Sequence, residues 1–179
     1  MSVLCVIELA RLCERPVYKS SMLFRFETAP FDPKFIQAYV TLTETAFGQA
    51  VPKDWVHHVT WRLEQMPDVT IFTALIDGQL IGYKAGYATA YNRYYSWMGA
   101  VHPDFRRRGI GRKLMEMQHQ WLDPSRFDLL ETQVAKTNIA MIKMNSEAGF
   151  KSSGLKMSKN GEPYLTMEKR LGDGLAAQS

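Results

Sequence analysis

The chain has 179 residues, of which 46% are hydrophobic and 22% are charged, and its formal net charge is +4 at pH 7. This length and composition exclude a disordered protein and predict one globular domain with a closed hydrophobic core. The small net charge also disfavours a broadly basic surface for binding nucleic acid.

The first residues are apolar but do not resemble a secretory or membrane-spanning segment. Glu8 and Arg11 interrupt the stretch MSVLCVIELARLC, no basic region precedes it, and it is too short to span a bilayer. We therefore expect neither a signal peptide nor a membrane anchor. The strand and helix patterns predict an extension over residues 1–21, a single domain over residues 22–171 and a tail over residues 172–179.

The chain contains two cysteines, Cys5 and Cys13. Their spacing matches no metal site, and it does not suggest a disulfide framework. The sequence therefore favours a reduced, cytoplasmic protein, and we expect no bound metal.

The first half of the chain contains helix patterns and then three strand patterns. Apolar residues recur at helical spacing from Lys34 to Phe47, and Gly48 ends this helix. Asp77-Gly78 lies between two apolar runs and predicts a hairpin. In chain order we expect a strand at 23–28, helices at 34–47 and 54–65, and an antiparallel meander of strands at 69–76, 79–90 and 94–101.

The second half predicts a crossover between parallel strands. A helix pattern at 110–122 carries Ile110, Leu114, Met117 and Trp121 on one face. The remaining elements are a strand at 127–134, a helix at 138–148 and two strands from residue 150 that join at Asn160-Gly161. The order βααβββαβαββ predicts an α+β fold. The strand-helix-strand crossover between residues 94 and 134 makes its two strands parallel, and the loop after the first strand is a favoured place for a ligand.

The stretch RRRGIGRK, residues 106–113, follows the corner His102-Pro103-Asp104 and opens the crossover helix. Free backbone N–H groups at a helix start attract anions, and Gly109 and Gly111 have no Cβ to keep a diphosphate away. An ordinary basic helix start is the alternative, but positive charge at this end of a helix is unfavourable unless an anion is present. The spacing differs from the dinucleotide fingerprint and from the Walker P-loop. We therefore favour a phosphate-binding turn.

Two segments carry a resemblance to a known family. VHPDFRRRGIGRKL resembles motif A of the GNAT acetyltransferases, which has Arg/Gln-x-x-Gly-x-Gly/Ala after a strand that ends in a Val-x-Pro corner. NIAMIKMNSEAGF, residues 138–150, resembles the next motif of that family, an Asn-led helix ending in Gly-Phe. The predicted element order agrees with that fold from about residue 23 to 170. The resemblance implies a mixed, mostly antiparallel sheet with a β-α-β crossover and splayed central strands.

The resemblance also implies a binding site for acetyl-CoA as the acyl donor. Backbone amides of the turn would hold its diphosphate, and main-chain groups at the end of the strand before it would bind the pantetheine arm. Asn138 matches the family asparagine that hydrogen-bonds this arm. The implied cofactor-binding residues are Ala100, Val101, Arg106, Arg107, Arg108, Gly109, Ile110, Gly111, Arg112, Asn138 and Asn145.

The catalytic acid of many relatives is absent. They have a tyrosine seven residues after the motif asparagine, and this chain has Asn145 there. An amide does not donate a proton at neutral pH, so we expect Asn145 to assist by a hydrogen bond to the thioester or to the sulfur. A hydrogen bond to the protein backbone is the alternative. A leaving thiol with a reference pKa of about 8.5 can depart as a thiolate with such help.

The sequence leaves the general base open. Some relatives use a glutamate on the strand before motif A, but residues 94–101 contain no carboxylate. Glu131, on the facing strand, is our first candidate, and a solvent-facing residue is the alternative. Three histidines have a suitable reference pKa. His102 lies in the Val-x-Pro corner, which suggests a structural role, and the adjacent His57 and His58 are expected to cap or flank a surface helix.

The aromatic residues between 87 and 97 suggest an acceptor pocket. Strand periodicity directs half of them into the core, and the others could line a pocket for an amine with an apolar or aromatic body. This segment contains Tyr87, Tyr91, Tyr94, Tyr95 and Trp97.

The resulting hypothesis is an acetyl-CoA-dependent N-acetyltransferase that acts on a primary amine of a small molecule or a peptide. The missing tyrosine and the missing strand carboxylate keep open a second hypothesis, a non-catalytic module that binds or senses acyl-CoA. A role in nucleic-acid binding would need further basic clusters, which the chain largely lacks. We expect neither a nucleic acid nor a membrane as a partner, and both a monomer and a homodimer are compatible with the sequence.

Overall fold

The computed structural model describes residues 21–158 and 161–172. They form the predicted succession of elements, and the ends differ from the predicted ends by no more than two residues. One short 3-10 helix, η1, is additional. The elements are β1 (Met22–Glu27), α1 (Pro33–Phe47), α2 (Lys53–Gln65), β2 (Thr70–Ile76), β3 (Gln79–Ala90), β4 (Arg93–Val101), η1 (Pro103–Phe105), α3 (Ile110–Trp121), β5 (Leu129–Ala135), α4 (Ile139–Glu147), β6 (Lys151–Met157) and β7 (Pro163–Arg170).

The predicted extension at 1–21 and tail at 172–179 fall outside the described residues, apart from Ser21 and Gly172. The same holds for Cys5 and Cys13. In the part of the chain that is described, none of the helices has the length and apolar character needed to cross a membrane.

The strands form one seven-stranded sheet with the order β1-β2-β3-β4-β5-β7-β6. Neighbouring strands are antiparallel except β4 and β5, which are parallel, as the crossover predicts. The sequence predicted the final hairpin but not that its second strand, β7, lies beside β5. The reason is visible in β6, whose residues KSSGLKM are all exposed. A polar strand that carries lysines is suited to the edge of a sheet.

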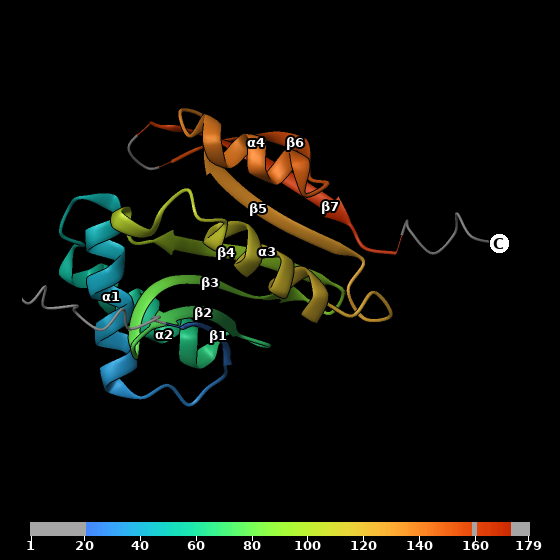
Figure 1. The fold of residues 1–179 in the computed structure, drawn as a ribbon. Coiled ribbons are helices and arrows are strands. Elements are labelled where there is room, and N and C mark those ends of the chain that lie inside the picture. Colours follow the sequence, from blue (N-terminus) through green and yellow to red (C-terminus); the bar gives the residue numbers. More distant parts are fainter. Residues whose placement is uncertain (1–20, 159–160, 173–179) are drawn as a thin grey trace, which may run out of the picture.

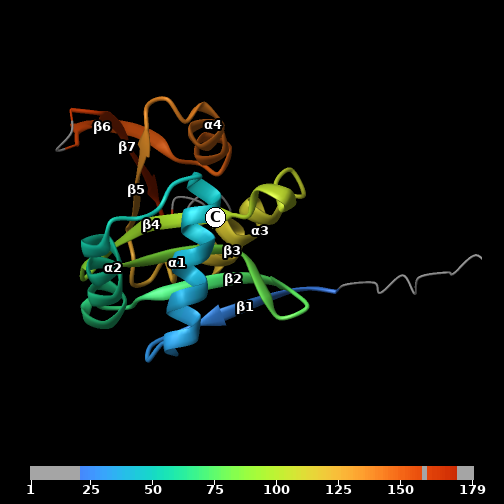
Figure 2. The ribbon, with the colours of Figure 1, turned by 90° about the vertical axis from the view of Figure 1, so that its left-hand side faces the viewer.

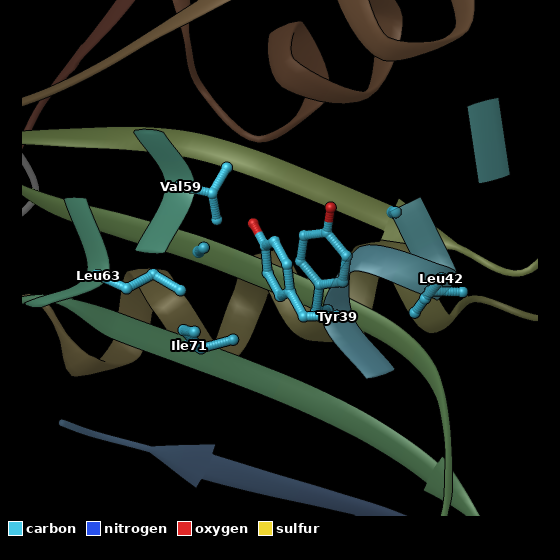
Figure 3. Packing of buried hydrophobic residues seen from close by; sticks show 8 residues of the cluster. Tyr39, Leu42, Val59, Leu63 and Ile71 are labelled. Carbon is cyan, nitrogen blue, oxygen red and sulfur yellow. The ribbon is translucent and has the colours of Figure 1, made fainter. Parts of the chain in front are cut away.

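Helices cover both faces of the sheet (Figures 1 and 2). α1 and α2 pack on one face, where Tyr39, Leu42, Val59, Leu63 and Ile71 form part of a buried cluster (Figure 3). The ring of Tyr39 lies 4.0 Å from the ring of Tyr83 on β3, measured between centroids. This cluster fixes α1 and α2 against β2, β3 and β4.

α3 covers the other face through the stripe that the sequence predicted. Ile110 and Leu114 are buried with Phe72, Ala74 and Ile81 of β2 and β3. α4 lies beside β5 on the same face, where its Met141 and Ile142 pack on a third cluster that includes Leu130, Val134 and Phe150. The start of α3 is thereby held at the end of β4, next to the strand pair β4 and β5.

Candidate functional site

β4 and β5 separate after a short parallel pairing. Only Arg93–Leu129, Tyr94–Leu130 and Tyr95–Glu131 are in register. The hydroxyl of Thr132 donates to the carbonyl of Ser96 at 2.9 Å, and in the described structure no ladder joins the two strands further on. This confirms the predicted splay. The edge of β4 from Trp97 to Val101 that faces β5 therefore has no strand partner.

The turn between β4 and α3 is held by side chains that precede the glycines. The His102 ring accepts a hydrogen bond from the backbone N–H of Asp104 at 3.3 Å, in agreement with a structural role. The guanidinium of Arg106 donates to the carbonyl of Val101 at 3.2 Å and to the carbonyl of Ala46 at the end of α1. The geometry thus supports a role for Arg106 in fixing the turn, where the sequence suggested a direct contact with phosphate.

The turn presents a row of backbone N–H groups without protein acceptors. Arg107 and Gly109 have positive φ angles of 63° and 77°. Gly109 is the N-cap residue of α3, and because it has no side chain it cannot cap the first amides of the helix. Among the described residues, none of the backbone N–H groups from Arg107 to Arg112 has a hydrogen-bond acceptor in the protein. Successive free amides at a helix start form an anion-binding site. The amides are not capped by the protein, as the phosphate hypothesis requires.

The remaining arginines of the turn have different surroundings. Arg108 donates to the carbonyl of Asp104 at 3.2 Å and lies over the ring of Phe105. Arg112 forms an ion pair with Glu147 of α4, with an N–O distance of 2.7 Å. Arg107 is exposed and has no hydrogen bond or ion pair to another described residue. Its charge is therefore available to a bound anion.

A small cavity of about 150 Å³ lies between α3 and α4, on the side of the sheet where the turn lies. Two nitrogen atoms near the splay, Nε2 of Gln118 and Nε2 of His119, are buried without a hydrogen-bond partner among the described residues. The other end of the Gln118 amide accepts from the hydroxyl of Ser96 at 2.6 Å, where the splay begins. Buried polar groups are normally paired, and of these two residues only His119 lines the cavity, so its Nε2 can bond to a ligand or a water there. The residues that line the cavity are Arg112, Met115, Glu116, His119, Met144, Glu147 and Ala148.

A larger cavity of about 620 Å³ lies over the β4–β5 and β5–β7 strands. Its wall contains aromatic side chains from β3 and β4, and the ring centroid of Tyr87 lies 5.7 Å from that of Tyr95 and 5.7 Å from that of Trp97. The guanidinium of Arg62 from α2 lies over Trp97. The lining residues are Arg62, Tyr87, Thr89, Tyr95, Trp97, Glu131, Thr132, Gln133, Ser153, Lys156, Thr166, Met167 and Glu168.

The aromatic segment divides between core and cavity as strand alternation predicts. Tyr94 is fully buried, and its hydroxyl is hydrogen-bonded to that of Thr70. Tyr87, Tyr95 and Trp97 line the larger cavity. Burial raises the pKa of Tyr95 to about 12, so its hydroxyl is protonated at neutral pH. Tyr91, 85% exposed, lies outside the cavity.

Glu131 is a cavity residue. Its neighbours Leu130 and Thr132 are buried, while Glu131 points to the opposite side of β5 and is 33% exposed. Its carboxylate lies 3.5 Å from the guanidinium of Arg93. A partly buried carboxylate beside the splay can accept a proton. His57 and His58 are exposed on α2 and do not line the cavity.

The two asparagines of α4 have different environments. Asn138 is exposed and caps α4, because its side-chain oxygen accepts from the backbone N–H of Met141 at 3.1 Å. Asn145 is only 3% exposed, and its side-chain nitrogen lies 3.8 Å from the sulfur of Met167. Met167 is the register partner of Thr132, so Asn145 lies close to the start of the splay. A sulfur atom is a weak acceptor, which leaves this donor poorly satisfied.

The strand end provides little side-chain polarity of its own. Ala100 is buried with the α1 and α2 cluster, and Val101 packs against the cluster that contains Ile110 at the start of α3. What Ala100 and Val101 offer toward β5 is therefore main-chain groups.

Two titratable residues near the splay were not singled out from the sequence. Burial lowers the pKa of Lys84 on β3 to about 8. Burial, with smaller contributions from Lys169 and Lys84, lowers the pKa of His119 to about 4. The sequence did contain a signal for Lys84, because it is the one charged residue in the otherwise apolar strand segment LIGYKAGY, residues 80–87. Nothing in the helix pattern marked His119, because it lies at the border between the apolar and polar faces of α3.

A family model described as "Acetyltransferase (GNAT) family" matches residues 36–150. A search of curated proteins by sequence found no match.

Solved structures share the fold at low sequence identity. The ribosomal-protein-S18-alanine N-acetyltransferase from Escherichia coli is 17% identical with a TM-score of 0.67, covering 84% of this chain and 97% of its own. A GNAT family acetyltransferase from Elizabethkingia anophelis with acetyl-CoA bound is 13% identical with a TM-score of 0.63, covering 84% and 98%. yncA from Salmonella typhimurium, solved with its cofactor acetyl-CoA, is 17% identical with a TM-score of 0.66, covering 85% and 95%. These similarities establish the α+β fold with its splayed, mostly antiparallel sheet.

Proposed function

The chain belongs to the acetyltransferase (GNAT) family, and with acetyl-CoA as its acyl donor we propose that it acetylates a primary amine of a small molecule or a peptide. Two similar structures contain acetyl-CoA, and a third is an alanine N-acetyltransferase. One observation carries the proposal. A row of free amides at the start of α3 and a cavity with an aromatic wall and a carboxylate lie along the same splayed strand pair, β4 and β5.

The donor side fits acetyl-CoA. The free amides from Arg107 to Arg112 suit the diphosphate, and Arg107 adds a positive charge. The unpaired edge of β4 from Trp97 to Val101 suits the two amides of the pantetheine arm, much as a strand would. Acetyl-CoA supplies an acetyl group that is activated as a thioester.

The acceptor side suits an amine. An ammonium group can be attracted to the rings of Tyr87 and Tyr95 and to the carboxylate of Glu131, while the guanidinium of Arg62 lies over the ring of Trp97. Glu131 then accepts the proton that the amine must lose before or while it attacks, and Arg93 holds that carboxylate in place. The aromatic wall excludes water from one side of the amine. The acceptor accordingly has an apolar or aromatic body beside its amino group.

The test is the release of free thiol from acetyl-CoA in the presence of a library of amines, with wild-type protein and with Glu131→Gln. We expect turnover with at least one amine. The substitution should lower kcat by about 10²-fold or more, since positioned general bases contribute on that scale. The dissociation constant for acetyl-CoA should not change, because Glu131 lies in the acceptor cavity.

Glu64→Gln is the matched control, since Glu64 is an exposed glutamate on α2 that lines neither cavity. It should leave kcat unchanged. A wild-type protein that binds acetyl-CoA but releases no thiol with any amine would favour the non-catalytic module. Equal kcat for Glu131→Gln and wild type would remove Glu131 as the base.

A further inference from the structure

His119 has a buried ring nitrogen that no described part of the protein uses. Its ring lies between α3 and the hairpin after α4, 5.6 Å from the ring of Phe150, and its Nδ1 lies 3.4 Å from the Nζ of Lys169. Its Nε2 is buried without a partner among the described residues. His119 also lines the cavity between α3 and α4.

The contact with Lys169 determines which ring nitrogen carries the proton. An ammonium group has three N–H donors and no acceptor, so Nδ1 of His119 must accept. Burial and two nearby ammonium groups, those of Lys169 and Lys84, lower the pKa of His119 to about 4, so the ring is neutral at pH 7. A neutral ring with an accepting Nδ1 carries its hydrogen on Nε2. His119 therefore presents a buried N–H donor that lacks an acceptor.

Lys84 adds a positive charge on the same face of the sheet. It is the register partner of Gly99, and a Cβ on Gly99 would lie 3.1 Å from its Cδ and 3.8 Å from its Nζ. The side chain of Lys84 thus lies across β4 at a position where β4 has no side chain, within the part of β4 that has separated from β5. No ion pair among the described residues involves Lys84. Gly82 and Gly86, two residues before and after Lys84 on β3, both face α3, since a Cβ on Gly82 would meet Ile110 and Leu114 and a Cβ on Gly86 would meet Gln118, the residue before His119. Lys84 therefore points toward the same helix as His119, and its charge contributes to the lowered pKa of His119.

The position of His119 along α3 matches the far end of the donor. The free amides lie at the start of α3, and a rise of about 1.5 Å per residue puts His119 about 14 Å further along the axis from Ile110. The pantetheine arm, which ends in the sulfur, has to cover a distance of that order. Gln118, the residue before His119, is hydrogen-bonded to Ser96 where the splay begins, and there the acetyl group must cross to the acceptor cavity.

We propose that His119 and Lys84 form a binding site for the sulfur of coenzyme A, in which the Nε2–H of His119 and the ammonium of Lys84 stabilise the thiolate that leaves. The inference rests on the proposed function. The amine nitrogen bonds to the carbonyl carbon, the carbon–sulfur bond breaks, its electron pair stays on sulfur, and the amine proton goes to the base. Asn145 offers an amide donor close by but no transferable proton, so a cation and an N–H donor compensate for the tyrosine of other family members.

The first experiment measures the thiol pKa of coenzyme A bound to the protein, from thiolate absorbance in the ultraviolet. The other charged groups that line the cavity, Arg112, Glu116 and Glu147, and Lys169, which contacts His119, stay constant in all variants. We expect the thiol pKa to fall by at least about one unit below its value in free coenzyme A, as it does for an anion near a positive charge. His119→Phe and Lys84→Met should each reverse most of this shift.

Affinity measurements separate this site from the rest of the donor site. Desulfo-coenzyme A, which lacks the sulfur, should bind wild type, His119→Phe and Lys84→Met with similar dissociation constants. His119→Gln should retain the thiol pKa shift of wild type because its amide can present an N–H near the position of Nε2. His58→Gln, on the exposed surface of α2, is the control, and thermal melting shows which variants are folded.

A separate NMR measurement tests which ring nitrogen of His119 carries the hydrogen. Nitrogen-15 NMR of labelled protein should show the His119 hydrogen on Nε2 and a change in that resonance when coenzyme A is added, but a smaller change with desulfo-coenzyme A. An unchanged thiol pKa in wild type, or the same shift in His119→Phe and Lys84→Met, would overturn the inference. If neither coenzyme A nor its desulfo form binds at all, the proposed function itself fails.

Discussion

A proline at position 112 tests whether backbone amides, and not only the arginines, bind the diphosphate. Arg112 lies in the first turn of α3, and its N–H has no acceptor among the described residues. Proline removes this N–H, and the first turn of a helix tolerates it. The residue before it, Gly111, has no Cβ to clash with the proline ring. Arg112→Ala is the matched control, because it removes the same side chain and its ion pair with Glu147 but keeps the N–H.

The expected difference follows from one hydrogen bond to a charged group. Such a bond contributes about 1.5–3 kcal/mol, and about 1.4 kcal/mol corresponds to a tenfold change in dissociation constant. Arg112→Pro should therefore bind coenzyme A roughly 10- to 100-fold more weakly than Arg112→Ala. The free energies of unfolding of the two variants should agree within about 1 kcal/mol, because the lost N–H makes no bond inside the protein.

Isothermal titration with coenzyme A gives the affinities, and urea denaturation gives the stabilities. Equal dissociation constants for the two variants, with both folded, would refute the role of this amide. A weaker Arg112→Pro that is also several kcal/mol less stable would show that the N–H is needed by the fold.

Two further predictions concern the packing around α3. Gly86→Ala should lower the free energy of unfolding by about 1–3 kcal/mol. The new Cβ would lie 2.5 Å from the Tyr94 ring and 2.7 Å from the carbonyl of Tyr95. An unchanged urea midpoint would contradict this prediction. His119 binds its proton near pH 6.5 when unfolded and near pH 4 when folded, so wild type should lose stability as the pH falls from 6.5 to 4, by up to about 3 kcal/mol. His119→Gln should lack this part of the acid sensitivity, and identical pH profiles of unfolding for the two proteins would contradict the shifted pKa.

The elements and the glycine turn before α3 were predictable because their signals are local. Gly48 ends α1 with a φ of 69°, and Asp77 and Gly78 form the hairpin with positive φ angles, as their residue types suggest. The glycine cap of α3 follows in the same way from the sequence RRRGIGRK. Hydrophobic periodicity gave the buried stripe of α3 and the buried side of the strands.

The roles of individual arginines were not predictable from the same stretch. The resemblance implied cofactor binding by each, and in the structure the side chain of Arg106 donates to the carbonyls of Val101 and Ala46, while that of Arg112 pairs with Glu147. These partners come from α1 and α4, far away in the sequence, so no local pattern could identify them. The direction of each side chain also depends on the path of the turn, where Arg107 has a positive φ.

The residues near the sulfur site were missed for the same physical reason. Lys84 and His119, which the sequence did not single out, belong to β3 and α3, and only the tertiary packing brings them near Asn145 of α4, which the sequence did single out. Their chemistry depends on burial and on partners that they lack, which the sequence does not record. The neutral state of His119, for example, results from its burial beside Lys169 and Lys84.

The short pairing of β4 and β5 explains why the site lies in the middle of the sheet. Three residue pairs join the strands, and then the Thr132 hydroxyl takes a carbonyl of β4 that a ladder would otherwise use. Because β4 stays bound to β3 and β5 stays bound to β7, the gap cannot close by a slip of either strand without breaking an antiparallel ladder. The unpaired main-chain groups of β4 then need a partner, since buried backbone polar groups are rarely left unsatisfied. The extended pantetheine arm of the proposed donor, which has its own amides, would meet that need between the free amides at the start of α3 and the larger cavity.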